Sequence, residues 1–177
     1  EVDANEGCAG PSVVIEFLDA LEAADPGAYA ALDYLEQPTE RDLAAHAWDL
    51  RPIAVRKPVF ADEGVTGLEE LRLAMSLGWT GPALKTCKGH SAALLEIAWC
   101  ELTGRPYALQ DLTNPGIAAV HAAGLAAHSC TYNGVELNVM QFVPRSSRLE
   151  AERFPSLFHV RAGMHRLDEL GEVGLGY

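Results

Sequence analysis

The sequence predicts an α/β fold built on a parallel sheet. Short apolar runs typical of strands alternate with longer segments of helical periodicity, and Gly or Pro closes most of them. Strands separated by helices of roughly 10 to 15 residues form right-handed crossover units, which place consecutive strands parallel to one another. A length of 177 residues and a hydrophobic content of 49% are sufficient for a domain with a buried core.

The expected helices share apolar residues at intervals of three and four. The first places Val13, Phe17 and Leu18 on one face, Thr39 is a candidate N-cap of the second, and Gly78 closes the third. These helices cover residues 12–24, 40–48, 67–77, 91–102 and 117–128. The strand-like runs are residues 32–36, 58–62, 83–85, 107–110 and 134–138. The part after residue 144 is polar and shows no clear periodicity.

Composition excludes several classes of protein. A net charge of -12 disfavours nucleic-acid binding, because phosphate contacts need concentrated Lys and Arg. No apolar run is long enough to span a membrane, so we expect no membrane partner. The four cysteines form no C-x-x-C pair and lack zinc-site spacing, which indicates a reduced, cytoplasmic protein; they are Cys8, Cys87, Cys100 and Cys130.

Charged residues stand where the expected strands end. Asp3, Glu36, Asp62 and Lys85 are separated by 33, 26 and 23 residues, each about the length of one strand and one helix. In a parallel barrel the strand ends gather on one rim, so these side chains would converge. Three converging carboxylates repel one another unless a cation lies between them, and Mg²⁺ prefers such oxygen ligands. The same residues could instead be helix caps or solvated turns.

The residues around these positions resemble the enolase superfamily, in particular its branch of mandelate racemase and muconate lactonizing enzyme. The similarity covers nearly the whole chain, with its segments in the family's order. The matching segments are VDAN (2–5), YLEQP (34–38), ADE (61–63), LKTCKG (84–89), GVELN (134–138) and the closing GLG (174–176).

The resemblance implies a partial (β/α) barrel of the TIM type. Residues 1–144 would form units three to eight of the barrel, and residues 145–177 a C-terminal tail that packs toward an N-terminal cap domain. A whole barrel has about 250 residues, so the chain is expected to be a part of a longer or truncated protein. Unpaired edges on its first and last strands favour a homo-oligomer.

The resemblance also implies the chemistry. Asp3, Glu36 and Asp62 match the metal ligands, for Mg²⁺ or Mn²⁺, and Lys85 matches a general base or acid. The expected reaction removes the proton alpha to the carboxylate of a small-molecule substrate, through a stabilised enolate. Its outcome could be that of a racemase, epimerase, cycloisomerase or dehydratase. The family's second base belongs to a strand that would precede Glu1. The expected seventh strand, residues 107–110, has no histidine, which favours muconate-lactonizing chemistry over the mandelate type.

Three residues are candidates for contacts with substrate: Asn5, Asp111 and Glu136. Asn5 could equally form a turn, and Asp111 could be a helix cap. Glu63 follows Asp62 and would face the other way, outside the ligand set.

Other polar residues have simpler interpretations. Lys88 is expected at the surface, and His90 takes a place where the family usually has glycine. Three further histidines are expected to be packing or surface residues: His46, His121 and His128.

Two alternatives remain open at this point. The chain could be a non-catalytic truncated or metal-binding structural fragment. It could also be a doubly wound nucleotide-binding module, but residues 7–10 are too poor in glycine for a phosphate-binding loop. Substrate identity, reaction outcome and oligomeric state are not determined by the sequence.

Overall fold

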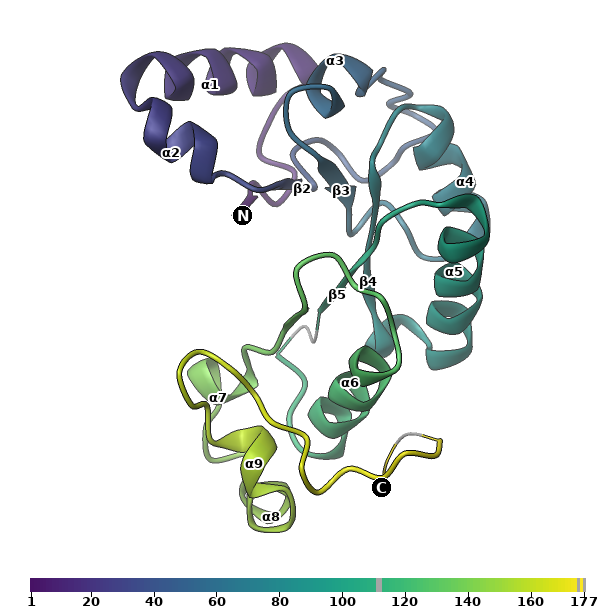
Figure 1. The fold of residues 1–177 in the computed structure, drawn as a ribbon. Helices are drawn as coiled ribbons and strands as arrows, with labels where there is room; N and C mark the ends of the chain where they lie inside the picture. The colour runs from purple at the N-terminus through teal and green to yellow at the C-terminus, as the bar shows by residue number, and fades with distance from the viewer. Residues whose placement is uncertain (111–112, 175, 177) are drawn as a thin grey trace. The chain divides into compact units, whose positions relative to one another are not determined.

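A computed structural model of the chain describes residues 1–110, 113–174 and 176 (Figure 1). The chain divides into two compact units. The first contains residues 1–83 and 95–107, and the second contains residues 84–94 and 108–177. One strand and one helix contribute residues to both units, and each unit is described here by itself.

The first unit is a parallel sheet with helical connections. Its strands follow one another in chain order, and each pairs in parallel with the next. They are β1 (Val2–Asp3), β2 (Leu35–Glu36), β3 (Val59–Ala61) and the start of β4 (Gly81–Lys85). The helices are α1 (Pro11–Ala24), α2 (Pro26–Ala31), α3 (Arg51–Ala54), α4 (Leu68–Ser76) and the later part of α5 (His90–Thr103).

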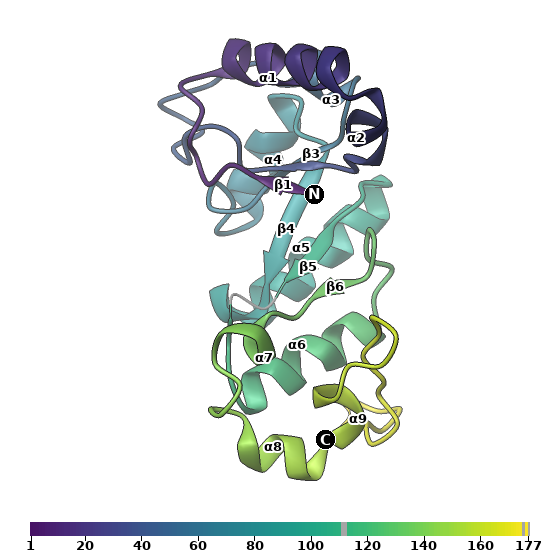
Figure 2. The same cartoon turned by 90° about the vertical axis from the view of Figure 1, so that its left-hand side faces the viewer.

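The buried face of α1 differs from the expected one. Val14 and Leu18 are buried, whereas Val13 and Phe17 are 40% and 39% exposed. The buried pair is spaced by four residues, as on one helical face, and α1 packs against α2 and α3 (Figure 2). Because three apolar residues follow one another at 13–15, periodicity alone does not determine which face is buried.

The helix expected at residues 40–48 does not form. Only turns occur there, and the side chain of Asp42 caps the amide of Ala45. The backbone amide of Arg41 donates instead to the carboxylate of Glu6, 2.9 Å away. Thr39 is buried and does not cap a helix; its carbonyl oxygen accepts a hydrogen bond from Gln37. The contact of Arg41 with the distant Glu6 outweighs the local helical pattern.

The second unit begins with the end of β4 and contains one further parallel strand pair, in the register Leu109↔Val135 and Gln110↔Glu136. Its remaining strands are β5 (Ala108–Gln110) and β6 (Val135–Glu136). Its helices are the 3₁₀ helix η1 (Thr86–Lys88), the start of α5, α6 (Ile117–Ala127), α7 (Val139–Phe142), α8 (Arg148–Arg153) and α9 (Pro155–Phe158).

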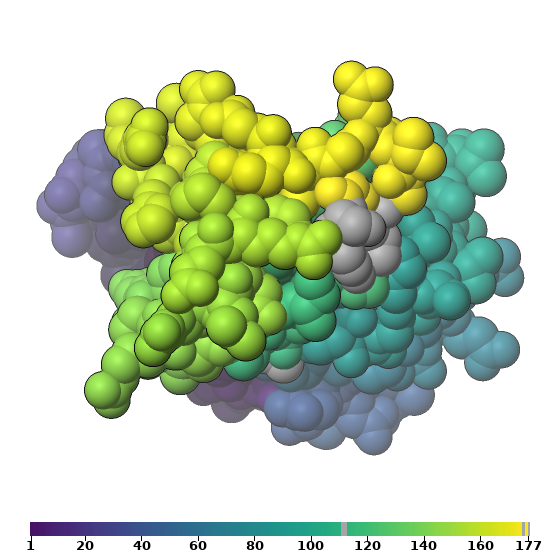
Figure 3. Space-filling model, turned by 90° about the horizontal axis from the view of Figure 1, so that it is seen from below, coloured from purple at the N-terminus to yellow at the C-terminus, as the bar shows by residue number. Residues whose placement is uncertain are grey.

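The C-terminal residues of this unit pack against α6. Phe154, Leu157 and Phe158 form a buried cluster with Val120, and Leu167 packs on its edge. In Figure 3 the residues after α9, in yellow, spread beside the helices α7 to α9. The helices α8 and α9 have six and four residues, which is too short for periodicity to predict them.

The strand–helix alternation and the parallel pairing within each unit confirm the predicted α/β class, a partial (β/α) barrel of the TIM type. None of the described helices is long and apolar enough to cross a membrane. The four cysteines, all of them described, form no disulfide. Burial raises the pKa of the Cys100 thiol to about 12, with a further contribution from the nearby Glu96 carboxylate.

The contact of Gly81 with a neighbouring loop generates a stability prediction. A Cβ atom on Gly81 would lie 1.9 Å from the carbonyl oxygen of Pro106 and 2.9 Å from the ring of Phe60. Gly81→Ala should therefore force a backbone shift and lower the free energy of unfolding by about 2 kcal/mol or more. Denaturant unfolding of the full protein measures this change.

The matched control is Gly10→Ala. A Cβ atom there would meet only the ring of Trp48, at 3.7 Å, which is ordinary van der Waals contact. This variant should change the free energy of unfolding by less than about 1 kcal/mol. Equal effects of the two substitutions would contradict the close approach at Gly81.

Candidate functional site

The three candidate metal ligands lie at or directly after the ends of adjacent strands of the first unit. Asp3 at the end of β1 is in register with Glu36 at the end of β2, and Glu36 is in register with Phe60 of β3. Residues in register on parallel strands point to the same face, and so do residues two apart on one strand. Asp62 comes two residues after Phe60, directly after the end of β3, so the three candidate ligands stand at the ends of neighbouring strands.

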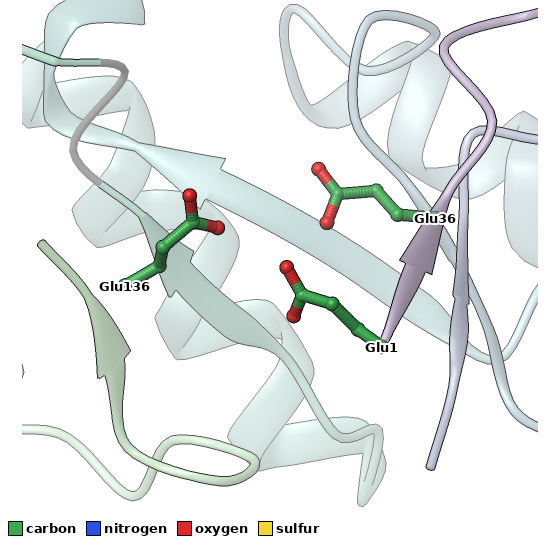
Figure 4. Close-up of side chains that lie close together, drawn as sticks. All are labelled: Glu1, Glu36 and Glu136. Atoms are coloured by element: carbon green, nitrogen blue, oxygen red, sulfur yellow. The ribbon is translucent and has the colours of Figure 1, made fainter. Parts of the chain in front are cut away.

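The three carboxylates differ in exposure and do not form one cluster. Glu36 and Asp62 are 2% and 3% exposed, whereas Asp3 is exposed. Their oxygens do not all lie within 4.8 Å of one another; an oxygen of Glu36 instead comes within 4.8 Å of one of Glu1 (Figure 4). Octahedral ligands of Mg²⁺ lie at most about 4.2 Å apart, so all three could share one ion only after side-chain rotation.

Asn5 is held against Asp3. Its backbone amide donates to Oδ1 of Asp3 at 2.8 Å, and its side-chain amide donates to Oδ2 at 2.5 Å. Asn5 has a φ of 44°, a left-handed conformation that Asn adopts more readily than most residues. Asn5 therefore lies in a turn and orients the carboxylate of a candidate metal ligand, and its contact with substrate stays a prediction.

A charged pair joins the loop after β1 to the loop after β2. The guanidinium of Arg41 donates to the carboxylate of Glu6 through Nε, at 2.8 Å, and through a terminal nitrogen. These hydrogen bonds hold the pKa of Glu6 below its ordinary value. Arg41 and Glu63 also line a cavity of about 440 Å³ in this unit, together with the first turn of α4. Sequence patterns did not single out either Glu6 or Arg41, because 35 residues separate them.

Lys85 is the last residue of β4. This residue is buried, with only 8% of its surface exposed. The chain then turns through η1 and through Gly89, whose φ of 126° is a conformation that residues with a Cβ rarely adopt. The strand thus ends in a sharp change of direction directly after the candidate base.

The loop after Lys85 is tied to α6 by two histidines. Nε2 of His121 lies 2.9 Å from Nδ1 of His90, close enough for a hydrogen bond in which one ring donates. Burial lowers the pKa of His121, and the neighbouring His90 lowers it further. His121 was expected only to pack or to lie at the surface. The unusual histidine in place of glycine at position 90 was the one sequence signal at this contact.

The candidate substrate contacts of the second unit are only partly described. Glu136 lies on β6, and its Oε1 accepts a hydrogen bond from the side-chain amide of Asn138 at 2.9 Å. Oδ1 of Asn138 in turn accepts from the hydroxyl of Thr113 at 2.8 Å. Asn138 and Thr113 were not predicted. Asp111 lies outside the described residues.

One comparison with known proteins identifies a family. The family model described as "Enolase C-terminal domain-like" matches residues 1–177. No curated protein sequence matches the chain.

Several solved structures have the same fold. A dipeptide epimerase from Cytophaga hutchinsonii, complexed with Mg and D-Ala-L-Val, has 23% identity and a TM-score of 0.63 over 77% of this chain and 36% of its own. The L-Ala-D/L-Glu epimerase from Bacillus subtilis has 21% identity and a TM-score of 0.68 over 81% and 39%. The N-succinyl Arg/Lys racemase from Bacillus cereus has 21% identity and a TM-score of 0.65 over 78% and 36%. The chain therefore spans less than two fifths of each of these relatives.

The histidine contact predicts how stability depends on pH. The pKa of His121 is lowered in the folded protein, so below its ordinary value of 6.5 the unfolded chain binds a proton more readily than the folded one. The free energy of unfolding should be highest above about pH 6.5 and decrease as the pH falls through the lowered pKa. Denaturant unfolding at about pH 8 and pH 5 measures the difference.

His121→Gln supplies the comparison for this prediction. It removes the titrating ring while an amide can still bond to His90. The variant should lose less stability than the parent protein between the two pH values. An unchanged pH difference would contradict the assignment of this effect to His121.

Proposed function

We propose a function for this chain on the premise that it belongs to the enolase C-terminal domain-like family, in the branch of mandelate racemase and muconate lactonizing enzyme. The proposed function is metal-dependent abstraction of the proton alpha to a substrate carboxylate. The observation that supports the proposal is the parallel register that pairs Asp3 with Glu36 and Glu36 with Phe60, two residues before Asp62. Within the family, racemisation or epimerisation is the outcome that the solved relatives favour.

The donor set fits a hard divalent cation. Asp3, Glu36 and Asp62 would supply carboxylate oxygens only, the ligand type that Mg²⁺ or Mn²⁺ prefers over softer metals. When bound, the ion would polarise the substrate carboxylate and favour the negative charge that develops next to it. Asn5 supports the site by holding both oxygens of Asp3.

Lys85 is the proposed general base or acid. Its place at the end of β4, the strand that follows β3 in the sheet, supports this role. The neutral amine would take the alpha proton from the substrate, and the ammonium would return it. A second base on the opposite face of the substrate is needed for racemisation.

The proposed substrate is a small carboxylate. Relatives were solved with dipeptides, or are named for N-succinylated amino acids, which favours an amino acid acylated on its nitrogen. Glu136 and Asp111 are proposed to contact the polar groups of this substrate, with Asn138 orienting Glu136. Packing of residues 145–177 toward a cap domain, homo-oligomeric assembly and a cytoplasmic location stay predictions.

A second candidate is a metal-binding structural piece without catalysis. It is favoured by the three carboxylates, whose oxygens do not all lie within 4.8 Å of one another. Such a piece would bind Mn²⁺ without exchanging any substrate proton.

The test uses the full protein with Mg²⁺ in D₂O. NMR measures the rate at which the alpha proton of the substrate exchanges with deuterium. A panel of dipeptides, N-acylated amino acids and 2-hydroxy acids supplies the substrates. Lys85→Ala should reduce the exchange rate of the accepted substrate about 10²–10⁴-fold, because it removes the proton acceptor. Removal of the metal with a chelator should abolish exchange.

Lys57→Ala is the matched control. Lys57 is a partly exposed lysine whose ammonium lies 4.5 Å from the ring centroid of Tyr29, outside the proposed site. Its loss should leave the exchange rate within about twofold of the parent. Exchange that survives Lys85→Ala would exclude the proposed base, and metal binding without exchange would favour the structural alternative.

A further inference from the structure

The side chain of Gln37 is fully buried and joins two of the strand-end loops. Its Oε1 accepts hydrogen bonds from the backbone amides of Asp62, at 2.8 Å, and Gly64, at 3.1 Å. Its Nε2 donates to the carbonyl oxygen of Thr39 at 2.8 Å. One amide group therefore holds both the turn after β3 and the segment after β2.

The backbone of Gln37 extends the same connections. Its amide donates to the carbonyl oxygen of Phe60 at 2.9 Å, and its carbonyl oxygen accepts from the amide of Glu6 at 2.8 Å. Gln37 thus contacts the loops that follow β1, β2 and β3. Each of these strands ends at or next to a candidate metal ligand.

The orientation of this amide is determined by its partners. Two backbone N–H groups face one end and one carbonyl oxygen faces the other, so only an oxygen at the first end and an NH₂ at the second satisfy all three. Gln37 also has a φ of 28°, a left-handed conformation that costs free energy for a residue with a side chain. A conformation of this kind persists where the surrounding hydrogen bonds over-determine it.

Asp62 depends on this contact more than the other two ligands. β3 ends at Ala61, so the amide of Asp62 lies beyond the strand and donates to Gln37 instead. The next residues are held in the same way through Gly64. The position of the Asp62 backbone relative to Glu36, the residue before Gln37, is therefore determined by the Gln37 side chain.

We propose that Gln37 is the positioning residue of the metal site and determines its affinity by holding Asp62 in place relative to Glu36. This inference rests on the proposed function, since it assumes that both carboxylates bind the ion. Gln37 is not itself a ligand, because both ends of its amide are bonded to backbone groups. It acts on the site only through the loop that it orders.

The experiment measures the affinity of the full protein for Mn²⁺ by EPR titration of the free ion. Gln37→Met keeps the length of the side chain and removes its three hydrogen bonds. It should raise the dissociation constant about 10- to 100-fold, as loss of a residue that supports metal ligands does elsewhere. Gln141→Met, at an exposed glutamine on α7, should leave the constant unchanged.

A second control separates positioning from general destabilisation. Leu18→Ala removes a fully buried side chain of α1 from the core of the same unit, and Leu18 is neither a candidate ligand nor part of a strand-end loop. It should lower the free energy of unfolding and leave the dissociation constant for Mn²⁺ unchanged. An equal loss of affinity in Leu18→Ala and Gln37→Met would overturn the proposal.

Asp62→Asn distinguishes failure of this inference from failure of the metal site. If Asp62→Asn weakens Mn²⁺ binding and Gln37→Met does not, only the positioning role is wrong. If neither weakens binding, the ligand set itself is wrong. Should Gln37→Met not fold, amide hydrogen exchange on the parent protein decides: slow exchange at Asp62 and Gly64 supports the proposal, and exchange at the rate of open loops overturns it.

Discussion

The candidate site depends on the parallel register of β1, β2 and β3. Because Asp3 lies opposite Glu36 and Glu36 opposite Phe60, side chains from separate parts of the chain point to one face of the sheet. A shift of one residue in either pairing would turn the carboxylate on that strand to the other face. The strands have only two or three residues each, so the ladder alone holds this register with few hydrogen bonds. Hydrogen bonds in the loops that follow the strands must therefore help to hold the strands in this register.

Strand ends and glycine-closed helices were predictable because their causes are local. The third expected helix ends before Gly78, which has a φ of 91°, and the structure places α4 there. The prediction of a helix at residues 40–48 was wrong because of a contact with a residue far away in the sequence. Arg41 is bound by Glu6, and that contact exists only after β1 and β2 have paired. The predicted buried face of α1 was wrong for a different reason. Several adjacent apolar residues in this helix permit more than one buried face.

The candidate metal ligands could be predicted from the sequence because they lie in the short segments that resemble the family. The residues that hold these ligands in place could not be predicted in this way. Gln37 follows Glu36 in the segment YLEQP, but its side-chain partners lie 25 and 27 residues further along the chain. The contact of His90 with His121 likewise joins residues 31 apart, and it required a packed α6 before either ring had a partner. Residue type indicates chemistry, but the partners of a buried amide or imidazole are determined by tertiary packing.

Backbone strain gathers where these loops meet. Asn5, Glu6 and Gln37 all have positive φ values, of 44°, 65° and 28°, and all lie within three residues of Asp3 or Glu36. Each is held by specific hydrogen bonds: Asn5 to Asp3, Glu6 to Arg41, and Gln37 to the turn after β3. Conformations of this kind cost about 1–3 kcal/mol each and persist only where the surroundings over-determine them. The hydrogen bonds that maintain these turns hold the backbone at the strand ends, so that binding of an ion would require rotation of side chains and little movement of the main chain. A site of that kind gains affinity from the order already present in the protein.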